Sequence, residues 1–389
     1  SDAGCQQGNA PLNASSDDLS TANARSGKQK SKRVLLIASY APSLLIFRSH
    51  LIRSLVSCGH EVVCMAPDFS PSDRAKVEDL GSTTADYPLA RRGLNPIEDL
   101  KTLRSLYAHM RVLRPDMVMG YTPKPAIYGS IAARLAGVPR IVPMITGLGY
   151  AFLGHSPRDR AVQLIGRRLY ARAFRSSHAA IFHNKDDLRL LARDGIIPAT
   201  LPTCVVGGSG VDLTEFKSLP LPGIGDGMTF VMIARLLKYK GVTEFCEAAR
   251  EVRRSAPNAR FILVGPEESG PGGLSAAQIE QWQDCVDYVG PQTDVRPYLA
   301  QCHVFVLPSY DGEGLPRTIL EAMAVGRPIL TTDTRGCRET VDERVNGCLV
   351  PAGDSQALAQ AMQSFLRRPD YRTVGVLALV GLVVLWEIG

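Results

Sequence analysis

The sequence of 389 residues lacks the features that mark several large classes of protein. Its 9 cysteines are scattered singly, with no Cys-x-x-Cys pair and no cluster of histidine and cysteine at metal-ligand spacing. This pattern argues against a disulfide framework and against a zinc site, and it favours a reducing compartment.

Long apolar runs are also scarce. Residues 1–33 are rich in Ser, Asn, Asp and Gly and hold no apolar segment, so they predict a disordered arm rather than a secretion signal. Near the other end, Thr373–Trp386 is almost wholly apolar, yet it is shorter than the ~20 residues of a membrane-spanning helix. Three interpretations of 371–389 stay open: a shallow membrane anchor, a buried core segment or an altered chain end.

What is present is the composition of a globular α/β protein. Apolar residues make up 45% of the chain and charged residues 21%, which is typical of a globular protein, and the length suffices for two domains. The expected order is a disordered arm (1–33), a first domain (34–218), a Pro- and Gly-rich linker (219–227), a second domain (228–370) and an atypical tail (371–389).

The segment 304–339 shows the architecture most directly. An apolar strand, Val304–Leu307, leads through a Gly-rich loop into a helix, Thr318–Val325, which Gly326 ends. Another strand begins at Ile329. Strand, loop, helix and strand in this order form the unit of a doubly wound parallel sheet.

Two carboxylates lie in this segment, Glu313 in the loop and Glu321 in the helix. Both positions can face the crevice at the carboxyl end of the strand, where ligands of such sheets bind. A carboxylate there can accept hydrogen bonds from ribose or sugar hydroxyls. Taken alone, the pair is better explained as a solvated glutamate in a loop and a glutamate on a helix surface.

The pattern Glu, seven residues, Glu within EGLPxxxxEAMAxGxP resembles the donor-site signature of the retaining glycosyltransferases of family 4, which have the GT-B architecture. The continuation TTDTRGCRETV looks like the branch that extends polyprenyl-diphosphate-linked glycans, of the N-acetylgalactosaminyltransferase or capsular polysaccharide type. The resemblance implies an α/β fold of two Rossmann-like domains facing across a cleft. It also implies retaining transfer from a UDP-sugar, with no further cofactor.

The same resemblance assigns the donor side of the site. Arg235 and Lys240 look like the pair that holds the donor diphosphate, Glu313 would contact the donor sugar and Glu321 the ribose. Two fixed cations stabilise the charge of a departing diphosphate, and no Asp-x-Asp motif is placed to hold Mg²⁺, so a metal-independent route is expected. Catalytic roles are predicted for Glu313, Arg235 and Lys240. The donor-binding set adds Gly290, Gly314 and Leu315.

The acceptor is expected on the first domain, where YTPKP and TGLGY resemble the same branch. Arg48 is a candidate for an anionic acceptor, with an ordinary surface arginine as the alternative. No catalytic histidine is assigned, and Tyr121 and Lys124 are crevice candidates with structural roles as the alternative. The full acceptor set is Ser39, Tyr40, Arg48, Tyr121, Lys124, Gly147, Gly149 and Tyr150.

A predicted helix at Pro157–Ser176 carries several arginines beside an apolar stripe. Residues 33–207 hold 23 Lys and Arg against 13 Asp and Glu, a net +10, whereas residues 227–370 hold 15 against 18, a net −3. A basic helix on a basic domain suits an anionic membrane surface, and a core-packed helix with a charged face is the alternative. The expected location is peripheral, on the inner face of the cell membrane, with no nucleic acid as partner.

The functional hypothesis is transfer of an N-acetylhexosamine or hexose from a UDP-sugar to a polyprenyl-diphosphate-linked sugar, in bacterial glycan or polysaccharide biosynthesis. Three alternatives stay open: a family 4 enzyme with a soluble acceptor, a GT-B epimerase that acts on UDP-sugars, and an inactive nucleotide-sugar-binding protein. The sequence leaves the donor sugar, the linkage and the oligomeric state open.

Overall fold

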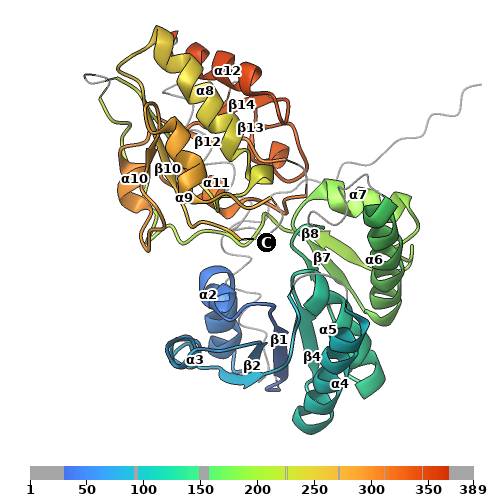
Figure 1. Ribbon diagram of the computed structural model, residues 1–389. Helices are drawn as coiled ribbons and strands as arrows, with labels where there is room; N and C mark the ends of the chain where they lie inside the picture. Colours follow the sequence, from blue (N-terminus) through green and yellow to red (C-terminus); the bar gives the residue numbers. More distant parts are fainter. Residues whose placement is uncertain are drawn as a thin grey trace, which may run out of the picture.

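The computed structural model describes residues 30–91, 95–148, 157–223, 225, 227–269, 272–310, 312–343 and 345–367. The predictions made for most of the arm 1–33, for the tail 371–389 and for Gly149 and Tyr150 lie outside these residues. Within them, the chain forms two α/β halves that stack on each other (Figure 1). We call them the first half, β1 to β8, and the second half, β9 to α12.

The first half is built on a parallel sheet of order β3-β2-β1-β4-β5, which a second parallel sheet of order β6-β7-β8 follows. The strand β1 sits between β2 and β4, so the chain reverses its direction of winding there. The elements are β1 (Arg33–Ile37), α2 (Pro42–Ser57), β2 (Glu61–Ala66), α3 (Pro71–Glu78), β3 (Thr83–Asp86), α4 (Pro96–Leu113), β4 (Met117–Gly120), α5 (Pro123–Ala136), β5 (Arg140–Ile141), β6 (Met144–Ile145), α6 (Pro157–Ser176), β7 (Ala180–Phe182), α7 (Lys185–Arg193) and β8 (Thr203–Val205).

The second half holds one six-stranded parallel sheet of order β11-β10-β9-β12-β13-β14. This is the strand order of a doubly wound dinucleotide-binding fold, with its switch point between β9 and β12. Its elements are β9 (Thr229–Ile233), η2 (Lys238–Lys240), α8 (Val242–Ser255), β10 (Arg260–Val264), α9 (Ala276–Ile279), η3 (Glu280–Trp282), β11 (Asp287–Tyr288), α10 (Arg296–Ala300), β12 (Val304–Leu307), α11 (Arg317–Ala324), β13 (Ile329–Thr332), η4 (Arg338–Thr340), β14 (Gly347–Val350) and α12 (Ser355–Arg367).

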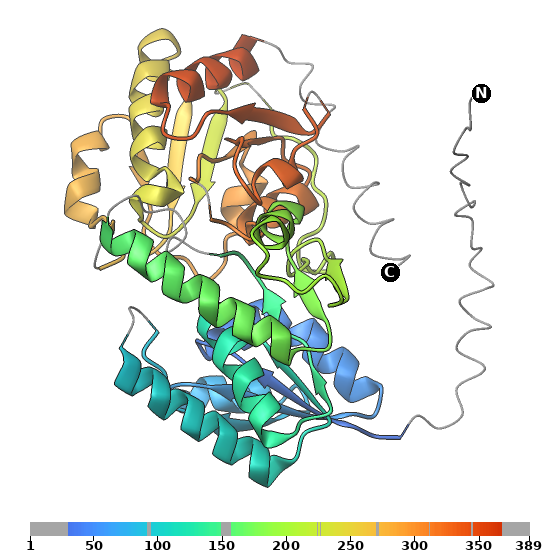
Figure 2. The same cartoon turned by 90° about the vertical axis from the view of Figure 1, so that its right-hand side faces the viewer.

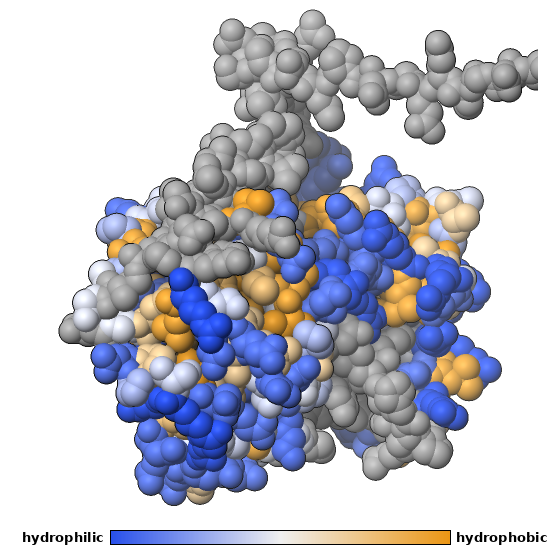
Figure 3. All heavy atoms as spheres, turned by 90° about the horizontal axis from the view of Figure 1, so that it is seen from above, coloured by the Kyte–Doolittle hydropathy of each residue, from blue (hydrophilic) through white to orange (hydrophobic). Residues whose placement is uncertain are grey.

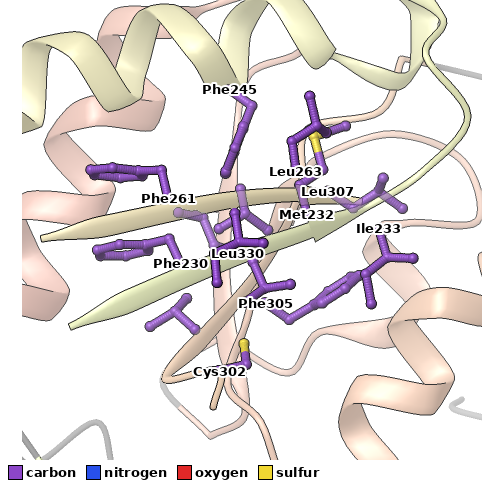
Figure 4. Packing of buried hydrophobic residues seen from close by; sticks show 14 of the residues in the cluster. Phe230, Met232, Ile233, Phe245, Phe261, Leu263, Cys302, Phe305, Leu307 and Leu330 are labelled. Atoms are coloured by element: carbon purple, nitrogen blue, oxygen red, sulfur yellow. The ribbon is translucent and has the colours of Figure 1, made fainter. Parts of the chain in front are cut away.

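The core of the second half lies between this sheet and its helices (Figure 4). The rings of Phe230 and Phe261, on neighbouring strands, stack with centroids 5.2 Å apart. Phe245 of α8 meets Phe261 edge-on at 6.2 Å. Helices cover both faces of a parallel sheet, so its central strands consist of consecutive apolar residues. Such runs can be recognised in the sequence, which is why these strands were predictable.

The prediction of an α/β protein with two doubly wound Rossmann-like domains is confirmed. The strands β5 and β6 join different sheets, because Pro143 between them has no N–H to continue the ladder. The helix α5 begins at Pro123, and proline is suited to the first turn of a helix.

The segment that leads into the second half runs along that half. Leu219 donates its N–H to the carbonyl of Val325 at 3.1 Å, and the buried Arg327 donates to the carbonyl of Pro220 at 3.1 Å. The domain boundaries at 218 and 228 stay a prediction. Seen from above, hydrophilic side chains predominate on the surface, and apolar ones gather in separate patches (Figure 3).

Candidate active site

The candidate donor residues gather at the carboxyl ends of β9 and β12. Lys240 ends the short η2, which follows β9, and Glu313 lies in the loop after β12. The Lys240 ammonium donates to the Glu313 carboxylate, and the Ser309 hydroxyl donates to the same oxygen at 3.0 Å. Both charged side chains are largely buried. Two of the three residues predicted to be catalytic therefore form a preformed ion pair.

The electrostatics keep Glu313 ionised. Burial by itself would raise the pKa of this carboxyl, but the attraction and hydrogen bond of Lys240, the Ser309 hydroxyl and the charge of Arg235 together hold its pKa below the ordinary value. A carboxylate in this state accepts hydrogen bonds and does not donate a proton near neutral pH.

Arg235 lies at the rim of this site, with half of its side chain exposed (51%). Its guanidinium donates to Glu268 at 3.1 Å and to the Tyr239 hydroxyl at 3.2 Å. Contact with a diphosphate would therefore compete with Glu268, whose side chain is only 16% exposed, for a guanidinium that is half exposed.

Glu321 lies on α11 and accepts from Arg317, one turn earlier, at 2.7 Å. Burial raises the pKa of this carboxyl, and Glu215 adds to the rise while Arg317 opposes it. The Arg317 guanidinium also lies 5.6 Å from the ring centroid of Phe47 on α2. Arg317 thus reaches from the donor side to the first half. The sequence reading missed it, although its spacing from Glu321 is that of a helical ion pair.

The loop that carries Glu313 contacts the loop after β6. A Cβ on Gly314 would overlap the carbonyl of Thr146, and one on Gly147, whose φ is +118°, would lie 2.6 Å from the Gly314 nitrogen. Backbone therefore packs on backbone here. Leu315 packs against Gly208, where a Cβ would come within 3.0 Å of the leucine side chain. The predicted donor residues Gly314 and Leu315 and the predicted acceptor residue Gly147 are brought together.

Arg48 and Tyr121 form a buried group in the first half. The Arg48 guanidinium lies 4.7 Å from the ring centroid of Tyr121, whose hydroxyl hydrogen-bonds the Ser43 hydroxyl at 2.9 Å. Arg48 is only 5% exposed, so the alternative of an ordinary surface arginine is wrong. Burial lowers the pKa of Arg48, and its Nε has no hydrogen-bond partner among the residues that the structure describes.

His183, which the sequence reading did not single out, completes this group. Arg48 donates to its Nε2 at 3.5 Å. Burial, and then the charge of Arg48, lower the pKa of His183 to about 3, so the imidazole is neutral. His183 directly follows β7, and residues at the carboxyl ends of parallel strands commonly line ligand sites. This position was the signal by which His183 could have been predicted from the sequence.

The remaining predicted acceptor residues are placed differently from one another. The Lys124 ammonium donates to Asp99 and to the Ala90 carbonyl, both at 2.7 Å, so it ties α5 to α4. The Ser39 hydroxyl accepts from Thr122 at 2.9 Å. Tyr40 is exposed, and Arg91 lies over its ring at 4.4 Å. Only Tyr40 among these offers an exposed side chain.

Gly290 follows β11, and β10 separates β11 from β9 in the sheet. Its carbonyl accepts from the Gly265 N–H at 3.0 Å, and a Cβ added to it would meet no atom within 4 Å. It therefore stands at the edge of the crevice rather than at the ion pair.

Within the described residues, no group of three or more His, Cys, Asp and Glu side chains is arranged to hold a metal ion. None of the helices described is both long and apolar enough to cross a membrane.

Two protein families match the chain. Residues 227–368 match the family described as "Glycosyl transferases group 1", and residues 47–206 match the "Glycosyl transferase 4-like domain". The two matches cover most of the second and the first half, respectively.

Two curated proteins are similar over much of their length. The N,N'-diacetylbacillosaminyl-diphospho-undecaprenol alpha-1,3-N-acetylgalactosaminyltransferase of Campylobacter jejuni is 28% identical, over 87% of this chain and 91% of that protein. The UDP-Gal:alpha-D-GlcNAc-diphosphoundecaprenol alpha-1,3-galactosyltransferase of Escherichia coli is 28% identical, over 71% of this chain and 72% of that protein.

Solved structures share the fold. Anabaena Alr3699/HepE, in complex with UDP and glucose, superposes with a TM-score of 0.68 at 18% identity, covering 91% of this chain and 94% of that one. Sucrose-phosphate synthase from Thermosynechococcus elongatus gives a TM-score of 0.73 at 18% identity, covering 92% and 96%.

Proposed function

We infer what this chain does from the family to which it belongs: it is a group 1 glycosyltransferase of the GT-B fold. We propose that it transfers an N-acetylhexosamine or a hexose from a UDP-sugar to a sugar carried on polyprenyl diphosphate, in bacterial glycan or polysaccharide biosynthesis. The activities for which the Campylobacter and Escherichia relatives are named support this acceptor class. The anomeric configuration of the transferred sugar is retained, and no metal takes part.

The donor binds at the carboxyl ends of β9 and β12. Lys240 and Arg235 hold the diphosphate, and their fixed charges stabilise the negative charge that grows as the nucleoside diphosphate leaves. The observation that carries this proposal is the buried pair of Lys240 and Glu313, because binding of a diphosphate gives Lys240 a second anion while Glu313 stays ionised.

Neighbouring groups bind the sugar and the nucleoside of the donor. The Glu313 carboxylate accepts hydrogen bonds from the donor sugar, and the backbone amides of Gly314 and Leu315 donate to its oxygens or to the phosphate. Glu321, held by Arg317, accepts from the ribose hydroxyls. Gly290 lies beside the base.

The acceptor binds on the first half. Arg48 is a buried cation that contacts neutral groups: the Phe47 carbonyl, the His183 ring and the Tyr121 ring. A buried charge without a counter-ion is unfavourable, so an anionic acceptor group is a suitable counter-ion. Ser39, Tyr40, Tyr121, Lys124 and Gly147 frame this side, and Gly149 and Tyr150 complete the proposed set outside the described residues.

The enzyme meets its lipid-linked acceptor at the inner face of the membrane, through α6. This helix lies at the front of the molecule in Figure 2. Arg168, Arg172 and Arg175 are exposed on it at helical spacing, beside exposed Leu164 and Ile165. Basic side chains around an apolar stripe favour an anionic lipid surface.

The test is transfer of radiolabelled sugar from a panel of UDP-sugars to polyprenyl-diphosphate-linked acceptors. Wild type should transfer one sugar, and Glu321→Ala and Lys240→Ala should lose at least about 100-fold in kcat/KM, because each removes a fixed contact of the donor. Lys101→Ala is the control, since Lys101 forms an exposed pair with Glu98 on α4. Transfer only to soluble sugars, or unchanged activity in both variants, would contradict the proposal.

A further inference from the structure

The amino-terminal end of α7, in the first half, lies against the loop that carries Glu313. Asn184 precedes this helix and is fully buried (0% exposed). Its Oδ1 accepts from the Asp187 N–H at 2.6 Å, which makes it the helix cap. Its amide Nδ2 donates one hydrogen to the Asp187 carboxylate at 2.9 Å. The other hydrogen is shared between the carbonyls of Gly314 at 3.0 Å and Glu313 at 3.4 Å.

Charged contacts hold α7 in this place. Asp187, also fully buried, lies 3.4 Å from a guanidinium nitrogen of Arg335, which follows β13. Asp186 pairs with Arg338 at 3.2 Å, and the backbone N–H of Lys185 donates to Glu339 at 2.6 Å. In Figure 1, α7 stands at the edge of the first half nearest the second. Asn184 is therefore the centre of a docked contact and not a lone hydrogen bond.

The geometry of a peptide unit gives this contact a consequence for the donor site. A peptide group is planar and trans, so its N–H points away from its C=O. When Asn184 holds the carbonyl of Glu313, it fixes the direction of the Gly314 N–H. When it holds the carbonyl of Gly314, it fixes the direction of the Leu315 N–H. Because one hydrogen of Asn184 serves both carbonyls, rotation of either peptide unit would break the shared contact.

We propose that Asn184 is a positioning residue for sugar transfer: from the acceptor half, it orients the Gly314 and Leu315 amides and the Glu313 loop toward the donor. This rests on the proposed function, which assigns those amides to the sugar or the phosphate. Asn184 itself touches no substrate. The donor site is complete only while α7 is docked, so Asn184 couples the geometry of the donor on the second half to the first half, where the acceptor binds.

Asn184→Asp tests the proposal with the smallest change. The carboxylate has the shape of the amide and still accepts the Asp187 N–H, so the helix keeps its cap. It has no donor for the two carbonyls or for the Asp187 carboxylate 2.9 Å away, and it places negative charge beside all three. We expect kcat to fall about 100-fold, since a displacement of about 1 Å at a reacting group costs this much. The Kd of UDP should change by less than kcat does, because Arg235 and Lys240 still hold the diphosphate.

Asn95→Asp is the matched control. Asn95 caps α4, where its Oδ1 accepts from the N–H groups of Ile97 at 3.1 Å and Glu98 at 3.4 Å, and it is exposed. Its kcat and its melting temperature should equal those of wild type. Asn184→Ser is the second variant, because serine also caps a helix but is too short to reach both carbonyls and adds no charge. Its kcat should fall too, by less than in Asn184→Asp.

Three measurements are made on each full-length variant: kcat and KM for transfer, the calorimetric Kd of UDP, and thermal unfolding. A kcat within twofold of wild type in both Asn184 variants would overturn the proposal, as would equal losses of kcat and UDP affinity. If wild type transfers to no acceptor, the proposed function fails on its own. The inference is then judged by hydrolysis of the UDP-sugar by water, which uses the same loop without an acceptor, and an unchanged rate in Asn184→Asp would overturn it.

Discussion

At the scale of single residues, the site is defined by a few buried charges whose partners decide their state. Glu313 and Glu321 resemble each other in the sequence, yet their environments push their pKa values in opposite directions, lower for Glu313 and higher for Glu321. The cause is the number of cations and donors that face each carboxyl. Glu313 has Lys240, Ser309 and Arg235 around it, whereas Glu321 has Arg317 alone and a second carboxylate, Glu215, nearby.

The first prediction concerns Lys240→Met, which keeps the length of the side chain and removes its charge. The pKa of Glu313 lies below its unfolded value, so the pair contributes stability above that value, which is lost as the pH falls through the folded pKa. Without Lys240, burial should raise this pKa. We expect a loss of about 3 kcal/mol at pH 7, typical of breaking a buried pair, that shrinks as the pH falls toward about 4 and Glu313 is protonated.

Urea unfolding of Lys240→Met and wild type between pH 7 and pH 4 measures this. Lys101→Met is the control, because its exposed pair with Glu98 should change stability by less than about 1 kcal/mol at any pH. A loss in Lys240→Met that is the same at every pH would contradict the assignment of the effect to Glu313.

The second prediction concerns Gly314→Ala. The new Cβ would overlap the Thr146 carbonyl, so the Glu313 loop must move away from the first half. We expect transfer to fall by about 100-fold or more, as for other displacements of a reacting group, while UDP still binds. Gly223→Ala is the control, since a Cβ there meets nothing within 4 Å and its backbone conformation suits alanine. Equal activities of the two variants would refute the close approach.

At the scale of elements, two helices of the first half have separate tasks. The helix α7 turns its amino-terminal end toward the second half, where Asn184, Asp186 and Asp187 are engaged. The helix α6 instead keeps basic and apolar side chains on its exposed face, while Tyr170 and Phe174 pack inward. A helix can do this because residues three and four apart share a face, so one side is core and the other is free for a partner.

The third prediction follows for α6. Replacing Arg168, Arg172 and Arg175 by glutamine should weaken binding to vesicles that contain anionic lipid. Each basic side chain near such a surface contributes about 1 kcal/mol, so the loss should be about 100-fold at low salt and smaller at high salt. Sedimentation with vesicles measures the partition coefficient.

The control removes the same charge elsewhere, through Arg253, Arg254 and Arg260 to glutamine on the exposed surface of the second half. It should leave vesicle binding unchanged within about threefold, because that half carries a net negative charge. Equal losses in both triple variants would indicate a general charge effect, and α6 would then be an ordinary core-packed helix.

At the scale of the whole molecule, the active site is a product of two halves that meet. The donor residues come from the second half, but Asn184, Gly147 and Phe47 of the first half contact their loop or their helix. Opening the halves would separate these contacts together. The closed arrangement is therefore part of the catalytic geometry.

The fourth prediction is that Arg335→Ala combined with Arg338→Ala loosens this arrangement. Both arginines pair with the first turn of α7. The pair of Arg335 with Asp187 is buried, so its loss should cost about 3 kcal/mol, and the partly exposed pair of Arg338 should add less than about 1 kcal/mol. We expect kcat to fall by at least about tenfold, because the donor loop is displaced. Small-angle X-ray scattering should show a larger radius of gyration. The pair Arg250→Ala and Arg254→Ala, on α8, is the control. An unchanged radius with unchanged kcat would contradict the prediction.

The sequence by itself determined what depends on neighbours along the chain. The apolar runs of β9, β12 and β13, the helix cap at Asn184 and the end of α11 at Gly326 were all predictable, because period, capping and glycine act over a few residues. The family resemblance added the donor residues, and the charge count added the basic first half.

Only the tertiary structure decided which distant residues meet. Lys240 and Glu313 are 73 positions apart and Asn184 and Gly314 are 130 apart, and no local pattern encodes such pairs. The burial of Arg48 is a second case, because its position along a helix does not show whether the side chain is exposed or buried. The partner of Lys124 is a third, because Asp99 comes within reach only when α4 packs on α5. The physical reason is that burial and partner choice depend on how helices and loops from both halves pack, and local periodicity carries no record of that.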